Sequence, residues 1–379
     1  MKRISQLDGI RGIAILLVLI YHYFCGQIVI HHPGLLSRLN LALSLSWSGV
    51  DLFFVLSGFL IAGILLDHRD APNYFRVFYI RRVCRIFPLY FLLLALFICL
   101  SATRLSTSPS FQWLFHNPMP LWSYASFTQN IFMGIRGDFG AHFLGVTWSL
   151  AVEEQFYLFV PFLIYFLPRR ALLGVFFLAV LGAPMLRHFH AGLEEMNALV
   201  NTPWRSDSLL SGAALAVLVR SRAFVAAVQN HRQFLHASFI ALLAGAAILT
   251  SRPNVLRDVH HLWFDHLWLA CLYTLFILIA YLDTAPALVG LLQSRVLVWF
   301  GRLSYGIYMF HEAMVGLLHG FFRHDEPHIR NPADAAITLL ALALTLLLAA
   351  LSFRFFESPI LRMGQRFQYA SNRGSNAEK

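Results

Sequence analysis

The sequence has 379 residues, of which 58% are hydrophobic and only 13% are charged. A soluble domain carries about twice this share of charge, so the composition excludes an ordinary soluble enzyme and indicates an integral membrane protein. The net charge of +10 would suggest a nucleic-acid partner in a soluble protein. In a membrane protein the gathering of Lys and Arg in cytoplasmic loops explains it more simply, so no nucleic acid is expected.

Ten apolar runs are long enough to cross a bilayer and predict an all-α, polytopic membrane protein. They fall at about 10–30, 46–67, 86–103, 146–167, 171–187, 205–221, 234–251, 262–283, 295–320 and 334–357. An even number of spans places both termini on one side of the membrane. The connections on that side contain about twice as many Lys and Arg as the others, so the positive-inside rule predicts cytoplasmic termini.

We therefore expect one transmembrane domain over residues 1–358 and a polar cytoplasmic tail over residues 359–379. The 104–145 connection is the longest and contains Trp113, Trp122 and several phenylalanines. This composition is typical of an external element that lies on the membrane interface or dips into it.

The first apolar segment contains Asp8 and Arg11 at its start and His22 well inside it. Arg11 and His22 are eleven residues apart, so three turns of a regular helix bring them to nearly one face, roughly 16 Å apart along the axis. Burial of an ionisable group at this depth in a bilayer costs free energy, so such a group is treated as a functional-site candidate. His22 is therefore a candidate catalytic residue.

A basic cluster, Arg81, Arg82 and Arg85, lies where the third span enters the membrane. One interpretation is a cluster that only sets the topology. The other is a phosphate clamp, because guanidinium groups bind phosphate through paired hydrogen bonds. Arg11 is expected at the same cytoplasmic boundary, and several arginines at one depth suit a polyanion such as a nucleotide diphosphate.

Several carboxylates lie inside the predicted spans. Asp51 follows about one turn inside the outer face, where it either has a catalytic or positioning role or forms a structural ion pair. Glu153 and Glu154 point to different sides of a helix, so at least one is expected to line a cavity. Arg205 and Asp207 are expected to form an ion pair that closes the start of their helix.

The ninth predicted span contains His311 and Glu312. His311 lies about 13 Å from cytoplasmic Arg302 along the helix, a depth similar to that of His22. Two histidines at one depth with a carboxylate beside them are typical of a proton-handling centre.

The remaining motifs are weaker. His260, His261 and His266 could suggest zinc, but no acidic or Cys partner follows at ligand spacing, and this group is expected at an external interface. We therefore predict no metal site. The glycines of the second span, including Gly58, are typical of close helix packing.

Six stretches together resemble the bacterial membrane-bound acyltransferase family 3, which includes O-antigen and peptidoglycan O-acyltransferases. They occur in the order found in that family, from the first span to the ninth. They are LDGIRGIAILLVLIYH at 7–22, GVDLFFVLSGFLI at 49–61, FYIRRVCRIFPLY at 78–90, TWSLAVEEQFYL at 147–158, RSDSLLSGAALA at 205–216 and SYGIYMFH at 304–311.

The resemblance implies an enzyme of the bacterial inner membrane that transfers an acyl group, often acetyl, from cytoplasmic acyl-CoA to a hydroxyl of a carbohydrate or glycolipid on the outer side. It implies no bound cofactor besides this donor substrate. It also implies a stand-alone member, since many relatives append an SGNH-hydrolase-like domain and this sequence shows none.

By motif, His22 would be the catalytic histidine, either as general base or as carrier of the acyl group. Arg11, Arg82 and Arg85, with Arg81 of the same cluster, would hold the phosphates of the donor. Glu153 and the SYGIYMFH segment with His311 would complete the site, and Asp51 is a further catalytic candidate from its position in the second span. Arg11 and His22 would then be two ends of one donor channel.

A rival interpretation from another class is a transporter or flippase for a polar glycan or lipid precursor, with the intramembrane charges along its path. Release of free CoA thiol would distinguish the two. The sequence leaves the identity of the acceptor open.

Overall fold

The computed structural model describes residues 5–30, 34–189, 195–250, 262–282 and 284–370. These residues form helices and connecting turns, and the β-structure among them is one isolated bridge between Ile28 and Ile329. Seven helical segments within the described part of the chain are long and apolar enough to cross a membrane. The predicted class, an all-α polytopic membrane protein, is confirmed.

A helix occupies each of the ten apolar segments predicted from the sequence. These helices are α1 (Ser5–Ile20), α3 (Gly49–Asp67), α4 (Tyr74–Ser101), α9 (Thr147–Phe166), α10 (Arg169–Phe189), α12 (Ser206–Leu218), α14 (Arg232–Thr250), α15 (Leu262–Tyr281), α17 (Arg295–Arg323) and α18 (Pro332–Ser352). The number of helices that cross the membrane and the side on which the termini lie stay predictions.

Three of the ten helices differ from simple membrane spans. Helix α12 is short and meets α13 (Arg222–Asn230) at a bend of 98°. The apolar part of α14 is also short. Helix α17 carries His311, Glu312 and His319 in its interior, and these polar side chains lower its hydropathy.

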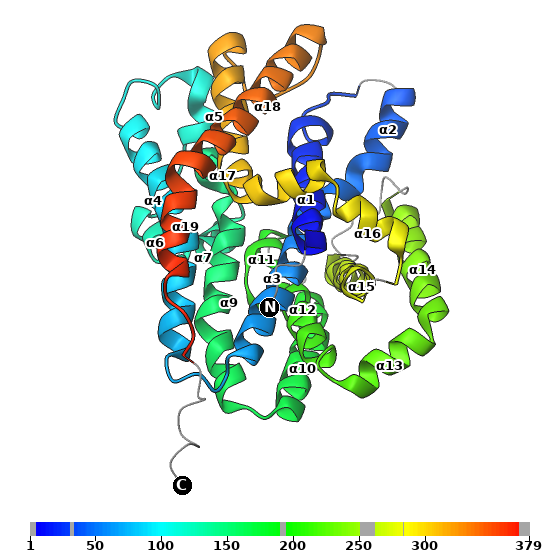
Figure 1. Ribbon diagram of the computed structural model, residues 1–379. Helices are drawn as coiled ribbons and strands as arrows, with labels where there is room; N and C mark the ends of the chain where they lie inside the picture. The colour runs from blue at the N-terminus through cyan, green and yellow to red at the C-terminus, as the bar shows by residue number, and fades with distance from the viewer. Residues whose placement is uncertain (1–4, 31–33, 190–194, 251–261, 283, 371–379) are drawn as a thin grey trace.

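Helices α1 and α3 lie in the middle of the molecule (Figure 1). Helix α1 packs against α3 and α17, and α3 packs against α12. The contacts are close because glycines face backbone: a Cβ at Gly301 would overlap the carbonyl oxygen of Asp8, and one at Gly58 would overlap that of Leu209. Small residues allow this approach between membrane helices, as predicted for Gly58.

The long connection between α4 and α9 folds over α17. It contains the short helices α5 (Gln112–Phe115), α6 (Leu121–Ala125), α7 (Gln129–Arg136) and α8 (His142–Gly145). Side chains of Trp113 and Leu114 fill the space above Gly316 of α17. The connection therefore supplies side chains to the same region as the ninth predicted span.

The segment predicted as a polar tail begins with a helix. A π-helical turn, Phe353–Glu357, leads from α18 into α19 (Ser358–Gln365). Helix α19 packs on α4, where Gly364 lies against Cys84. Residues 371–379 lie outside the described residues.

Candidate active site

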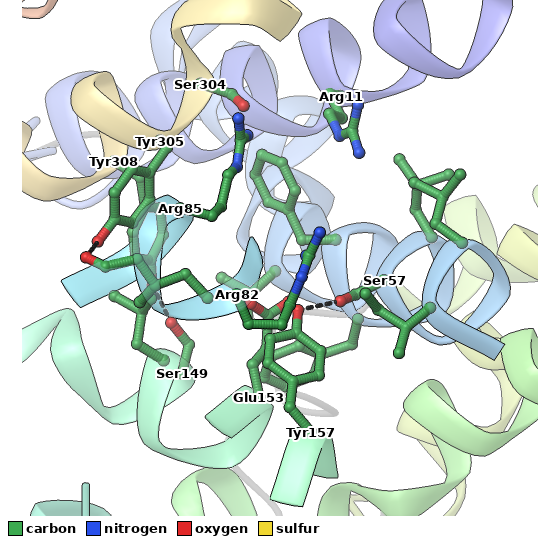
Figure 2. A pocket seen from close by; sticks show the side chains of 18 of the residues that line it. Arg11, Ser57, Arg82, Arg85, Ser149, Glu153, Tyr157, Ser304, Tyr305 and Tyr308 are labelled. Carbon is green, nitrogen blue, oxygen red and sulfur yellow. Dashed lines mark hydrogen bonds between the residues drawn. The ribbon is translucent and has the colours of Figure 1, made fainter. Parts of the chain in front are cut away.

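Three of the predicted phosphate ligands line one cavity of about 180 Å³, which we call the cationic cavity. Figure 2 shows the guanidinium groups of Arg11, Arg82 and Arg85 directed toward this shared space, with Glu153 and Tyr157 below them. The polar lining residues are Arg11, Ser57, Arg82, Arg85, Ser149, Glu153, Tyr157, Ser304, Tyr305 and Tyr308. The arginines that the sequence placed at one boundary are thus brought together.

The positive charge of the cationic cavity is only partly compensated. Arg11 forms an ion pair of 2.9 Å with Asp8, one turn earlier on α1. The guanidinium of Arg82 lies over the Tyr157 ring, 5.9 Å from its centroid. Neither Arg82 nor Arg85 makes a side-chain hydrogen bond or an ion pair with the described residues, so two guanidinium groups remain available to an anion.

Glu153 lines the cationic cavity, which meets the expectation that one of the two adjacent glutamates faces a cavity. The resemblance implied that Glu153 completes the catalytic site, and the structure places it with the arginines and not in the cavity that His22 lines. Tyr157 follows one turn later, and its hydroxyl lies 2.5 Å from that of Ser57.

Arg81 lies apart from the other arginines. Its Nε donates a hydrogen bond of 2.8 Å to the carbonyl oxygen of Phe367, and its guanidinium lies over the Tyr369 ring. It does not line the cationic cavity, because neighbouring residues of a helix point about 100° apart.

His22 lies in a π-helical turn, Tyr21–Cys25, that continues α1. Such turns occur often at functional sites. Because a carbonyl oxygen only accepts hydrogen bonds, the 3.0 Å contact of Nδ1 with the Val18 oxygen places the ring proton on Nδ1. Nε2 then faces Oε1 of Glu312 at 3.4 Å.

His311 lies directly beside His22, with ring centroids 4.8 Å apart. The expectation that the two histidines share a depth is confirmed by this contact. Nδ1 of His311 is 2.7 Å from the Tyr308 carbonyl oxygen, while its buried Nε2 has no hydrogen-bond partner among the described residues. The other carboxylate oxygen of Glu312 lies 3.8 Å from Nδ1 of His142.

His22, His311 and Glu312 together could coordinate a metal ion. One ligand atom from each of His22, His311 and Glu312 lies within 4.8 Å of the other two. Each ring also directs its Nδ1 to a backbone carbonyl, as metal-binding histidines commonly do. The expectation that no metal is bound therefore stays a prediction.

His22 and Glu312 border a second cavity of about 200 Å³, which we call the histidine cavity. Its polar and aromatic lining residues are Tyr21, His22, Gln27, Trp113, His142, Glu312, Glu326 and His328. No described residue lines both cavities. Tyr308 borders the cationic cavity, and its ring lies 5.5 Å from that of His311. Arg11 and His22 therefore line two different cavities with a wall of Tyr308 and His311 between them, and the expectation of one continuous channel stays a prediction.

Asp51 belongs to a buried ion cluster that borders neither cavity. Its Oδ1 lies 2.7 Å from Arg205 and 3.4 Å from His266, with all three side chains 1% exposed. Asp207 pairs instead with Arg187, at 2.6 Å. The expected Arg205–Asp207 pair is therefore wrong, and the structural alternative for Asp51 is the one that its contacts support.

The structure also differs from the sequence-based predictions at one residue and shows two residues that those predictions missed. His266 is buried in the ion cluster and not at an external interface, and His260 and His261 lie outside the described residues. His142 stacks on Trp113, with ring centroids 4.2 Å apart, but no motif of the long connection marks it. Tyr157 could have been found, because it follows Glu153 by one helical turn.

The fold and the site define a class: helical multi-pass membrane proteins whose intramembrane ionisable groups line cavities. The model of a family described as an acyltransferase domain matches residues 4–354. The chain belongs to this family, in agreement with its resemblance to the membrane-bound acyltransferase family 3.

Two relatives illustrate the similarity. The chain is 27% identical over 402 residues to the peptidoglycan O-acetyltransferase OatA of Listeria monocytogenes. It is 25% identical over 378 residues to the O-acetyltransferase OatA of Staphylococcus aureus. The alignments cover 96% of this chain but only 56% and 58% of these relatives, so the chain spans a little over half their length. No solved structure matches the chain at a significant level.

Proposed function

We propose that this protein is an O-acyltransferase of the bacterial inner membrane. It moves an acyl group, which we take to be acetyl, from cytoplasmic acyl-CoA to a hydroxyl of a glycan or glycolipid on the outer side. One observation carries the proposal: two guanidinium groups that form no ion pair or side-chain hydrogen bond with the described residues face one cavity, while a histidine–carboxylate pair faces the next. The names of the relatives support the acetyl group and a glycan acceptor.

The donor would bind through its negative charge. Arg82 and Arg85 form no ion pair or side-chain hydrogen bond with the described residues, and Arg11 borders the same space, so the three suit the diphosphate of CoA. The flexible pantetheine arm would carry the thioester toward His22. For this the arm has to pass the Tyr308–His311 wall.

His22 would act as the general base. Its Nδ1 proton is held by the Val18 carbonyl, so Nε2 is the atom that takes the proton of the acceptor hydroxyl. The hydroxyl oxygen attacks the thioester carbonyl carbon, the carbon–sulfur bond breaks, and the proton passes from Nε2 to the CoA sulfur. Glu312, at 3.4 Å, stabilises the imidazolium between these steps.

The test is release of CoA thiol by purified protein supplied with acetyl-CoA and a glycan acceptor. His22→Ala should lower the rate roughly 10²–10⁴-fold, the usual contribution of a positioned acid–base group. His231→Ala, at an exposed histidine, is the matched control and should leave the rate unchanged.

Unchanged transfer by a normally folded His22→Ala protein would contradict the proposal. Movement of the glycan across a vesicle membrane without thiol release would instead support the transporter. A stable acyl group on His22 in a rapidly quenched reaction would show that this histidine carries the acyl group.

A further inference from the structure

The segment that follows α19 is bound to the connection between α3 and α4. The side-chain amide of Asn73 makes two hydrogen bonds to its backbone: Nδ2 donates to the Gln368 carbonyl, and Oδ1 accepts from the Ala370 N–H, each at 2.9 Å. Arg81 adds a third bond, to the Phe367 carbonyl at 2.8 Å. Residues 367–370 therefore have a fixed position at the end of α4 that holds the arginine cluster.

This segment places an aromatic ring beside Arg81. The Tyr369 ring stacks on His68 with centroids 4.0 Å apart and planes 23° apart. The Arg81 guanidinium lies 5.3 Å from the centroid of the same ring. Because Nε is also bonded to a backbone carbonyl, both the position and the plane of the guanidinium are set by the C-terminal segment.

The remaining edge of this guanidinium is free. The two terminal nitrogens of Arg81 have no hydrogen-bond partner among the described residues, and no described carboxylate pairs with them. A guanidinium that is already ordered loses less entropy when it binds, and its fork of donors fits a phosphate. Arg81 directly precedes Arg82, which lines the cationic cavity.

Coenzyme A carries two separate phosphate groups: the diphosphate next to the pantetheine arm and a phosphomonoester on the 3′-oxygen of the ribose. We propose that Arg81, positioned by Tyr369, binds the 3′-phosphate of the donor, while Arg11, Arg82 and Arg85 hold the diphosphate. This proposal rests on the proposed function, because it takes acyl-CoA as the donor. It assigns Arg81 a phosphate subsite separate from the cationic cavity.

Three donors test the assignment: acetyl-CoA, acetyl-3′-dephospho-CoA and S-acetylpantetheine. In the wild-type protein the KM for acetyl-CoA should be lower than that for the dephospho compound, by roughly tenfold for one charged hydrogen-bonded contact. Arg81→Gln should remove this preference by raising the KM for acetyl-CoA, with the KM for acetyl-3′-dephospho-CoA and the kcat unchanged.

Two further variants separate a subsite from a general loss of charge. Arg82→Ala combined with Arg85→Ala should raise the KM for both nucleotide donors equally and leave that for S-acetylpantetheine unchanged. Tyr369→Ala should reduce the preference for the 3′-phosphate because it frees the guanidinium, whereas Tyr369→Phe keeps the ring and should retain the preference.

A preference that survives Arg81→Gln would overturn the proposal. So would an effect of Arg81→Gln that is equal for all three donors and appears only in bilayers with phosphatidylglycerol, because Arg81 would then bind a lipid phosphate. If the wild-type protein consumes none of the donors, the proposed function fails. In that case the affinities of CoA and 3′-dephospho-CoA are measured by calorimetry for the wild-type protein and for Arg81→Gln. A preference for CoA that is lost in Arg81→Gln would still show that Arg81 binds the 3′-phosphate, and a preference that both proteins share would overturn the assignment.

Discussion

Asp51 and His22 are both ionisable groups inside predicted spans, and their surroundings give them different roles. Asp51 is enclosed by Arg205 and His266 and has no access to either cavity. His22 borders the histidine cavity and keeps Nε2 directed at Glu312. Burial in an ion pair away from both cavities indicates a structural role, whereas partial exposure to a cavity leaves a group able to meet a substrate.

Asp51→Asn should therefore lower the stability of the protein and leave the rate of the chemical step unchanged. Removing one partner of a buried ion pair costs about 3–5 kcal/mol, because Arg205 would keep an uncompensated charge. We expect a lower melting temperature in detergent, with kcat per folded molecule retained. Normal stability with lost activity would instead restore the catalytic role predicted from the sequence.

Asp325→Asn is the matched control for this change. Asp325 pairs with Arg330 at 2.8 Å, but the two side chains are 44% and 49% exposed. The hydrogen bond from Arg330 lowers the pKa of the Asp325 carboxyl, so this carboxyl is ionised at neutral pH. Exposed pairs contribute about 0–1 kcal/mol, so the melting temperature should hardly change.

At the level of single residues, the sequence predicted the ionisable side chains of the site but not all of the residues that they contact. Arg11, Arg82 and Arg85 were predicted to converge because they share a boundary, and they do. The Asp51–Arg205 pair could not be predicted, because it joins residues 154 positions apart through the packing of α3 on α12. His142 was missed because its meeting with Glu312 depends on how the long connection folds.

Among the elements, the crossing of α1 and α17 determines the site, since these helices supply both histidines. Helix α1 approaches α17 so closely that Gly301 lies against the backbone of Asp8, and Gly12 lies against that of Leu297. The sequence predicted both helices. It did not predict the π-helical turn at Tyr21–Cys25, because the run of apolar residues fits a regular helix equally well.

Gly301→Ala should loosen this crossing. The added Cβ would overlap a carbonyl oxygen that cannot move without shifting α1, and overpacking of this kind costs about 1–3 kcal/mol. We expect a lower melting temperature and reduced transfer, because Arg11 and His22 move with α1.

Gly174→Ala in α10 is the matched control, for which we expect no loss of stability. A Cβ at Gly174 meets no atom within 4 Å, and alanine is favoured over glycine inside a helix by about 1 kcal/mol. The melting temperature should stay the same or rise. Equal effects of the two substitutions would show that the α1–α17 contact is looser than described.

For the whole molecule, hydrophobic runs and charge were enough to predict the class and the helices. They were not enough to fix the number of spans, since α12 is short and bent toward α13 and α17 carries polar groups. Nor could they show that Arg11 and His22 line two different cavities, because the Tyr308–His311 wall depends on rotamers and on the contact between α17 and α9 through the Ser149–Tyr308 hydrogen bond.

The predicted topology can be tested with reporter fusions. Green fluorescent protein joined after Lys379 should fluoresce, and alkaline phosphatase at the same place should be inactive, because the charge bias places the C-terminus in the cytoplasm. Phosphatase joined after Thr107, at the start of the long connection, should be active. Activity at Lys379 or its absence at Thr107 would contradict the positive-inside assignment.

The wall between the two cavities has a consequence for the cell as well as for the reaction. In the proposed topology one cavity opens toward the cytoplasm and the other toward the outside, and both are lined by groups that can bind ions and water. If they were joined, protons and small ions would leak through the protein and dissipate the membrane potential. In the proposed reaction, Tyr308 and His311 would therefore preserve the permeability barrier of the membrane during transfer of the acyl group.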